Sequence, residues 1–239
     1  MKRILLPLML ISSLCFAQDD RSPCLTDLPS HFSPENTVVI FDFHNVLGYT
    51  DWTKGLKTLL WDNPDRFSRL SRITSYGIRK MIHDKSIKNS SLLEYLDSGE
   101  PGEAYEKANL ELVNAYWIDP QSEALVKKLH NEGYKLILFS NTPESTMKFQ
   151  ENAHPELFGL FDKKWYRKVG STVTKKSPEA FEQVKKLGAE ALGHTPQRYV
   201  FVDDTKKNIK LGEEAGICGI LFKTVKQTEK VLTEAGILQ

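Results

Sequence analysis

The sequence is poor in cysteine, in excess charge and in long apolar runs. Its 239 residues include only three cysteines, and 32 Lys and Arg stand against 31 Asp and Glu. Two of the basic residues, Lys2 and Arg3, lie at the N-terminus, so the rest of the chain carries a net charge of −1. Without a clustered basic excess, no nucleic-acid partner is expected. The length and the hydrophobic content of 40% fit one large domain, or one domain with a sizeable insertion.

The first seventeen residues have the pattern of a secretory signal peptide. Lys2 and Arg3 precede an apolar run over 4–16, which is too short to span a bilayer comfortably, and Ala17 ends a small-residue cleavage site. The alternative is a membrane anchor that is retained. No other stretch is apolar enough to span a membrane, so no stable anchor is expected after cleavage. We therefore predict a signal peptide over 1–17 and an exported protein, periplasmic or secreted.

Removal of the leader leaves two cysteines, Cys24 and Cys218. An exported protein could join them in one disulfide. The sequence favours the alternative that Cys218 is a buried thiol in a strand, because it lies between Ile217 and Gly219 in an apolar run. Residues 18–36 contain three prolines, and they are predicted to form an extended lead-in without regular structure.

The remaining chain alternates between strand and helix patterns, apart from one helical insertion. Strands are expected at 37–41, 135–139, 164–169, 199–202 and 217–222, and helices at 121–131, 143–151, 178–192, 206–215 and 225–235. This order predicts an α/β fold with a Rossmann-like parallel sheet and helices on both faces. Residues 50–118 show helical patterns and no convincing strand. The core domain is therefore predicted to comprise 37–49 and 119–239.

Polar residues follow three of the predicted strands. Asp42 ends the first strand, Ser140 and Asn141 end the second, and Asp203 and Asp204 end the fourth. On its own, Asp42 could be no more than a helix or turn cap. In a parallel sheet, however, the carboxyl ends of strands share one edge, where ligands bind. Carboxylates that meet there would repel unless a cation joined them, and ligands that are all oxygen suit Mg²⁺.

A hydroxyl and backbone N–H groups at the start of a helix, as at Ser140 to Pro143, suit an anion such as phosphate. A lysine from Lys175–Lys176 would neutralise the remaining charge. Carboxylate, metal, hydroxyl and lysine together predict a phosphoryl-transfer site with an aspartate nucleophile.

The chain resembles the haloacid dehalogenase superfamily, whose four motifs occur in order between Thr37 and Leu238. The matching segments are VVIFDFHNVL (38–47), LILFSN (136–141), KKSPEAF (175–181) and VFVDDTKKN (200–208). The spacing within the third segment favours Lys175 over Lys176 as the family lysine. The insertion at 50–118 resembles the family's α-helical type 1 cap, where Trp52, Trp61, Arg79, His83, Tyr95 and Tyr105 could contact a substrate.

The resemblance implies a role for each matching residue. Asp42 would be the nucleophile and a metal ligand, and Asp204 would be a second ligand. Lys175 would stabilise both nucleophile and phosphate, while Asp203 orients it. The further implied assignments are phosphate binding by Ser140 and the Asn141 amide, and a metal-bound water held by Asn208.

His44 departs from the family pattern, because phosphatases of this family usually have an aspartate two residues after the nucleophile. That aspartate protonates the leaving oxygen and then activates water. The backbone carbonyl of His44 would still bind the metal. Three hypotheses remain for the side chain: a working acid/base, a bystander in a slow phosphatase, or a mark of an inactive phosphoryl-binding protein. Dehalogenases also vary here, but they need no metal, and the Asp203–Asp204 pair argues for one.

The sequence therefore predicts an exported, Mg²⁺-dependent phosphatase that hydrolyses a small phosphomonoester through an aspartyl-phosphate on Asp42. The alternative is a weak or inactive phosphoryl- and metal-binding protein that acts through its cap. Neither the substrate nor the oligomeric state can be derived from the sequence.

Overall fold

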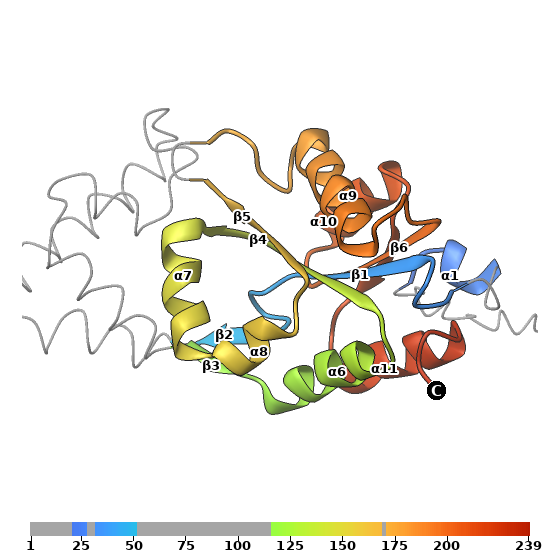
Figure 1. Cartoon of the computed structure of the whole chain (residues 1–239), viewed down its shortest axis with the longest axis horizontal. Helices are drawn as coiled ribbons and strands as arrows, with labels where there is room; N and C mark the ends of the chain where they lie inside the picture. The colour runs from blue at the N-terminus through green and yellow to red at the C-terminus, as the bar shows by residue number, and fades with distance from the viewer. Residues whose placement is uncertain (1–20, 28–31, 52–115, 169–170) are drawn as a thin grey trace, which may run out of the picture.

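A parallel five-stranded sheet forms the centre of the molecule (Figure 1). The structure is a computed structural model, and it describes residues 21–27, 32–51, 116–168 and 171–239. The strand order is β5-β4-β1-β6-β7, and every neighbouring pair is parallel. These strands are β1 (Thr37–Phe41), β4 (Lys135–Pro143), β5 (Lys163–Arg167), β6 (Arg198–Asp203) and β7 (Cys218–Leu221). The predicted α/β class with a parallel sheet is confirmed.

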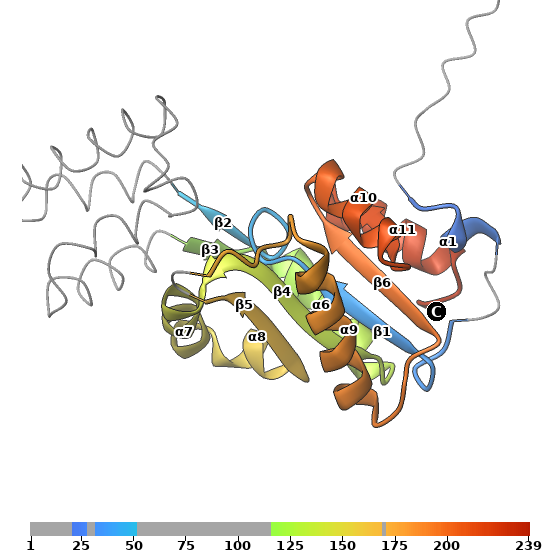
Figure 2. The same ribbon diagram turned by 90° about the horizontal axis from the view of Figure 1, so that it is seen from above.

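Helices cover both faces of the sheet, as Figures 1 and 2 show. On one face lie α9 (Pro178–Leu192) and α10 (Lys206–Glu214), and on the other lie α6 (Pro120–Asn131) and α11 (Val225–Glu234). The alternation of side chains along β1 explains the two cores. Val38 and Ile40 pack in the cluster that includes α9, while Val39 and Phe41 pack in the cluster that includes α6. Since β1 is buried on both faces, it is apolar throughout.

Local sequence signals account for the helix boundaries. The side chain of Asp119 caps α6 by accepting hydrogen bonds from the backbone N–H groups of Gln121 and Ser122. Helix α9 begins with Pro178 at its first position and ends at Gly193, which has a φ of 83°. The predicted bounds of α9 are the observed ones, because both signals are local.

Four short elements differ from the sequence predictions. Helix α8 (Pro155–Gly159), which follows α7 (Glu144–Ala153), was not expected, and five residues are too few to show a helical period. The strands β2 (Gly48–Thr50) and β3 (Tyr116–Ile118) form an antiparallel pair, although no strand was expected from Thr50 to Trp117. Their pairing joins residues far apart in the sequence, which local patterns do not reveal. The expected extended lead-in is also wrong in part, because Cys24–Asp27 form the short helix α1.

Cys24 and Cys218 form a disulfide, so the preference for a free thiol at Cys218 is wrong. Their Cα atoms lie 5.9 Å apart. The cause is tertiary: the backbone N–H of Ser22 donates to the carbonyl of Gly219 at 2.9 Å, and Arg21 bridges antiparallel to Ile220. These contacts bring the lead-in alongside β7. Cys218 is nevertheless a buried residue of a strand, as expected.

The predicted leader over 1–17 lies outside the described residues. So do almost all of the predicted cap at 50–118 and its six candidate substrate contacts. In the part of the chain that the structure describes, no helix is long and apolar enough to cross a membrane.

Candidate active site

The ends of three adjacent strands bring the predicted site residues to one edge of the sheet. In the register of the sheet, Phe41 at the end of β1 pairs with Val202 of β6 and with Leu138 of β4. The chain beyond each strand therefore emerges on the same side, as expected for parallel strands. Asp42, Asp203 and Asp204 meet there. One carboxylate oxygen from each residue lies within 4.8 Å of the corresponding oxygens of the other two.

Asp42 is held mainly through one of its two carboxylate oxygens. Its Oδ1 accepts a hydrogen bond from the backbone N–H of Phe43 at 2.7 Å and lies 2.7 Å from Nζ of Lys175. Within the described residues, Oδ2 accepts no hydrogen bond. The carboxylate is therefore fixed in orientation while one oxygen stays available for a ligand or for chemistry.

Lys175 joins two carboxylates inside the protein. Its side chain is 1% exposed, and Nζ lies 2.7 Å from Asp42 and 2.8 Å from Asp203. Its Nζ also lies over the rings of Phe139 and Phe201, at 5.0 and 5.4 Å from their centroids. The neighbouring Lys176 is exposed. Of the two candidate lysines, the structure thus places Lys175 at the carboxylates.

Asp203 is fully buried, and both of its oxygens accept hydrogen bonds. Oδ1 accepts from the backbone N–H of Thr205 at 2.8 Å and from Nδ2 of Asn208 at 3.0 Å. Oδ2 accepts from Lys175 and, at 3.1 Å, from the same Asn208 amide. These bonds fit the predicted orienting role of Asp203. The amide of Asn208, which was predicted to hold a metal-bound water, is directed at Asp203.

The donor set fits a hard divalent cation. Three carboxylates and one ammonium leave two negative charges in a small volume, and oxygen ligands suit Mg²⁺. Asp203 is fully buried, and its oxygens accept four hydrogen bonds from Lys175, Thr205 and Asn208. The cation ligands would therefore be Asp42 and the half-buried Asp204. His44 was predicted to contribute only its backbone carbonyl, so its side chain is not needed in the carboxylate cluster.

The electrostatics of the cluster show the same charge imbalance. Burial raises the pKa of Asp42 from 3.8 to about 7, although the charge of Lys175 opposes this shift. The charge of the neighbouring Asp203 contributes to this raised pKa of Asp42. A cation at the site would favour the ionised form of Asp42, which is the nucleophilic form.

His44 is half-buried beside the carboxylates. Its ring makes an edge contact with Tyr116 of β3, with ring centroids 6.1 Å apart. The pKa of His44 is lowered by burial, although the charge of Asp204 opposes this shift. The imidazole is therefore held near the carboxylates by a residue that lies 72 positions further along the chain.

The predicted phosphate-binding residues Ser140 and Asn141 lie in the C-terminal end of β4, which extends to Pro143 beside β5 and not only to Phe139 as predicted, so that α7 begins at Glu144. The hydroxyl of Ser140 is buried and accepts a hydrogen bond from the backbone N–H of Thr142 at 3.1 Å. The side-chain oxygen of Asn141 accepts from the backbone N–H of Lys175 at 2.8 Å, which ties this end of β4 to the lysine.

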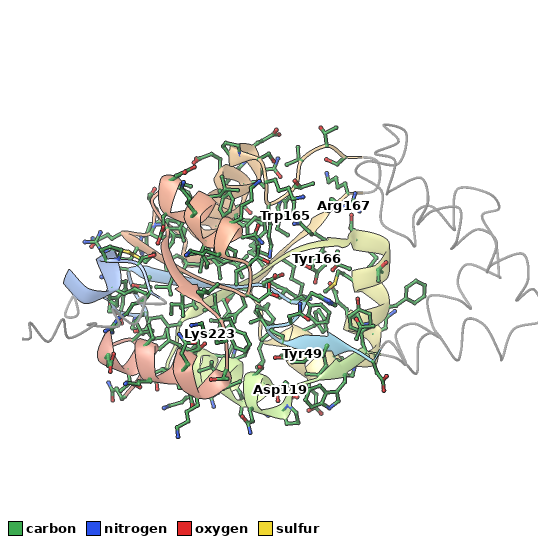
Figure 3. All side chains as sticks on the ribbon, turned by 180° about the vertical axis from the view of Figure 1, so that it is seen from behind. Tyr49, Asp119, Trp165, Tyr166, Arg167 and Lys223 are labelled. Atoms are coloured by element: carbon green, nitrogen blue, oxygen red, sulfur yellow. A yellow bond between two sulfur atoms is a disulfide. The ribbon has the colours of Figure 1, made fainter. Side chains whose placement is uncertain are left out.

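Sequence reasoning missed two residues that support the site. Arg167, which ends β5 beside Tyr166 (Figure 3), is buried, and its Nε donates to the backbone carbonyl of Asn141 at 3.1 Å. Asn45 donates through Nδ2 to Oδ2 of Asp204 at 2.9 Å. The position of Asn45, three residues after Asp42, was the only signal that could have indicated it. Nothing in the local sequence distinguishes Arg167 from a surface arginine on an edge strand.

Comparisons with known proteins agree with this architecture. A family model described as "Hydrolase: haloacid dehalogenase-like hydrolase" matches residues 37–216. A haloacid dehalogenase family enzyme from Bacteroides thetaiotaomicron shares 21% identity at a TM-score of 0.52, covering 79% of this chain and 94% of that one. A magnesium-bound hydrolase of the same superfamily from Bacillus subtilis shares 15% identity at a TM-score of 0.50, covering 76% and 86%.

The matches also include an L-2-haloacid dehalogenase from Xanthobacter autotrophicus, with 17% identity, a TM-score of 0.49 and 84% coverage of each chain. At these identities, the similarity to solved structures concerns the fold alone.

Proposed function

The chain belongs to the haloacid dehalogenase-like hydrolase family, and within that family we propose that it is an exported, Mg²⁺-dependent phosphatase acting on a small phosphomonoester. The observation that carries the proposal is the buried contact of Lys175 with both Asp42 and Asp203, beside a third carboxylate, the half-buried Asp204. A buried lysine between two carboxylates leaves an excess of negative charge at the strand ends, and that excess suits a metal better than it suits a metal-free haloacid site.

The chemistry begins at Asp42. Its Oδ2 attacks phosphorus while Oδ1 stays bound to Lys175 and to the backbone of Phe43. Lys175 offsets negative charge on the nucleophile and on the transferring group, and Asp203 keeps its ammonium in place. A Mg²⁺ ion bound by Asp42 and Asp204 would offset further charge on the phosphoryl oxygens.

The Ser140 hydroxyl and the Asn141 amide bind the phosphoryl oxygens in this proposal. His44 donates a proton to the leaving alcohol oxygen and then takes one from the water that hydrolyses the aspartyl-phosphate. Its two-residue separation from the nucleophile is the same as that of the usual family aspartate. An imidazole is able to carry out both proton transfers near neutral pH.

The second candidate is a binding protein that holds metal and phosphate without turnover and acts through its cap. The observation in its favour is His44 itself, which replaces the usual acid/base and is packed against Tyr116. An imidazole is bulkier than a carboxylate and reaches a different point, so proton transfer to the leaving group could fail while binding persists.

The test compares wild-type protein with Asp42→Asn, His44→Asp and the matched surface control Asp51→Asn. Phosphate release is measured on an aryl phosphate and on a panel of phosphorylated metabolites, with Mg²⁺ or with chelator. We expect Mg²⁺-dependent release by wild type and by the control, and a loss of at least about 10³-fold in Asp42→Asn, since nothing replaces the nucleophile.

His44→Asp separates the roles of the histidine. A fall of about 10²-fold or more would identify His44 as the acid/base, whereas a rise would show that histidine impairs a phosphatase. If wild type and Asp42→Asn are equally inactive on the whole panel, the phosphatase proposal is wrong. Calorimetric binding of phosphate and Mg²⁺ that survives in Asp42→Asn would then favour the binding protein.

A further inference from the structure

Asn45 has an unusual backbone conformation next to the site. Among the residues that the structure describes, it is the only one other than glycine with a positive φ, which is 60°. L-residues rarely adopt this left-handed region, and asparagine tolerates it better than most. The conformation therefore restricts this position largely to asparagine and glycine.

The loop that carries Asn45 is closed by its own backbone and by α6. The carbonyl of Phe43 accepts hydrogen bonds from the backbone N–H groups of Leu47 and Gly48, both at 2.9 Å. The backbone N–H of Asn45 donates to the carbonyl of Gly48 at 2.8 Å. The hydroxyl of Ser122, in the first turn of α6, donates to the carbonyl of Val46 at 2.7 Å. Asn45 is thus presented from a loop with little freedom.

The side chain of Asn45 uses that position to hold Asp204. Its Nδ2 donates to Oδ2 of Asp204 at 2.9 Å across 159 residues of sequence. The other oxygen of Asp204, Oδ1, accepts from the hydroxyl of Thr205 at 3.1 Å. Asp204 is only half-buried, so these two bonds, and not packing, set the orientation of its carboxylate. One bond comes from the neighbouring residue, and the other comes from the loop that follows the nucleophile Asp42.

The chemical type of the side chain suits this task. A primary amide donates a hydrogen bond without adding charge, so it orients a carboxylate and leaves its negative charge for a cation. A lysine at this position would compete with the cation, and an aspartate would repel Asp204. A glycine would allow the same backbone conformation but would provide no donor.

We propose that Asn45 is a positioning residue, which holds Asp204 in the orientation needed for a divalent cation between Asp204 and Asp42. The inference rests on the metal site of the proposed function. By linking the β1 loop to the end of β6, Asn45 sets the separation of the two carboxylates before the cation arrives, and a preformed site loses less freedom on binding.

The test measures Mg²⁺ affinity by calorimetry for wild-type protein, Asn45→Gly and Asn45→Ala, together with the melting temperature in chelator. Asn45→Gly keeps the backbone conformation and removes only the amide. We expect its melting temperature without metal to stay close to that of wild type, and its Kd for Mg²⁺ to rise about 2- to 10-fold, which is the range of the net contribution of one typical hydrogen bond. A merely structural residue would not change the affinity while the metal-free stability stayed constant.

Asn45→Ala removes the same amide but, unlike glycine, keeps a Cβ in the left-handed conformation without the polar side chain that makes asparagine tolerant of it. It should therefore lose the same affinity and also melt at a lower temperature in chelator. If both variants bind Mg²⁺ as tightly as wild type, the inference about Asn45 is overturned. If wild type itself binds no Mg²⁺, the metal site of the proposed function is wrong, and so is the inference about Asn45. If wild type binds Mg²⁺ but releases no phosphate, only the proposed activity is lost.

Discussion

At the scale of single residues, Asp42 bears the main electrostatic cost of the site. It is 7% exposed and has a raised pKa, so the folded protein without metal binds the proton of Asp42 more tightly than the unfolded chain does. Between pH 3.8 and about 7 the unfolded chain releases this proton first, and the free energy of unfolding falls as the pH rises. Above about pH 7 the folded protein has also released this proton, and Asp42 lowers the free energy of unfolding no further.

Asp42→Asn should therefore stabilise the protein when metal is chelated. An amide carries no charge to bury, and Lys175 keeps Asp203 as its partner. We expect a higher melting temperature than that of wild type at pH 8, and a smaller difference at pH 5. Each kcal/mol corresponds to about 2–4 °C for a chain of this size. Differential scanning fluorimetry in chelator measures this difference in melting temperature, with Asp51→Asn as the control. A melting temperature of Asp42→Asn below that of wild type at pH 8 would contradict the prediction.

The sequence identified most of the residues that meet at the site, because strand ends in a parallel sheet converge and each polar residue follows an apolar strand. It did not identify Asn45 or Arg167. Both act on groups from other strands, Asn45 on Asp204 and Arg167 on the Asn141 carbonyl. Such bonds depend on loop conformation and on which strands are neighbours, and neither is encoded in local spacing.

At the scale of helices and strands, close packing of α9 on the sheet depends on a small residue. A Cβ at Gly188 would lie 2.7 Å from Cε1 of Tyr199 and 3.5 Å from Cγ2 of Val38. The ring of Tyr199 has little room to move, because its hydroxyl donates to the carbonyl of Lys185 at 3.0 Å. A methyl group at position 188 therefore collides with β6, although alanine favours helices.

Gly188→Ala should consequently destabilise the protein by about 1–3 kcal/mol. Gly159→Ala in α8 is the matched control, since a Cβ there would meet nothing within 4 Å. It should stabilise the protein by about 0.4–1 kcal/mol, because alanine restricts the unfolded chain more than glycine does. Urea unfolding of both variants provides the comparison. Equal and favourable effects would show that α9 does not pack on β6 as closely as described.

The disulfide attaches the lead-in to the edge of the sheet. It closes a sequence separation of 194 residues, and a covalent link over a long loop restricts the unfolded chain. We expect Cys24→Ser, Cys218→Ser and the double variant to lose about 2–5 kcal/mol each, because each one removes the same bond. Reduced wild-type protein should unfold at the same urea concentration as the double variant; a clear difference between single and double variants would contradict this expectation.

Most of the longer helices and strands were predicted from the sequence, because their signals lie within each segment. Apolar runs such as β1 and capped amphipathic helices such as α9 carry their signals within themselves. The pair β2–β3 and the Cys24–Cys218 bond both join distant segments, and no pattern within either segment reveals the partner. The sheet order likewise needed the structure, since the sequence indicated parallel strands without placing them.

At the scale of the whole molecule, the chain closes one edge of its sheet with its own N-terminal region. The strand β7 would otherwise present an open edge, and Arg21 and Ser22 lie along it through the bridge to Ile220 and the bonds to Gly219. The hydroxyl of Ser22 also contacts Glu213 of α10 at 2.5 Å. This closure begins four residues after the predicted cleavage site at Ala17.

The predicted leader and the Cys24–Cys218 disulfide both point to an exported protein. Disulfides persist in oxidising compartments, so an exported chain would acquire the bond that a cytosolic chain would lack. Expressed with its leader in a bacterial host, the protein should be recovered from the periplasm or medium. Mass spectrometry should give an N-terminus at Gln18 and no alkylation of Cys24 or Cys218. A variant without residues 1–17 should stay in the cytosol with both thiols reactive and unfold at lower urea concentration. Recovery of the uncleaved chain from the cytosol would contradict export, because the leader is the only targeting signal on which this prediction depends.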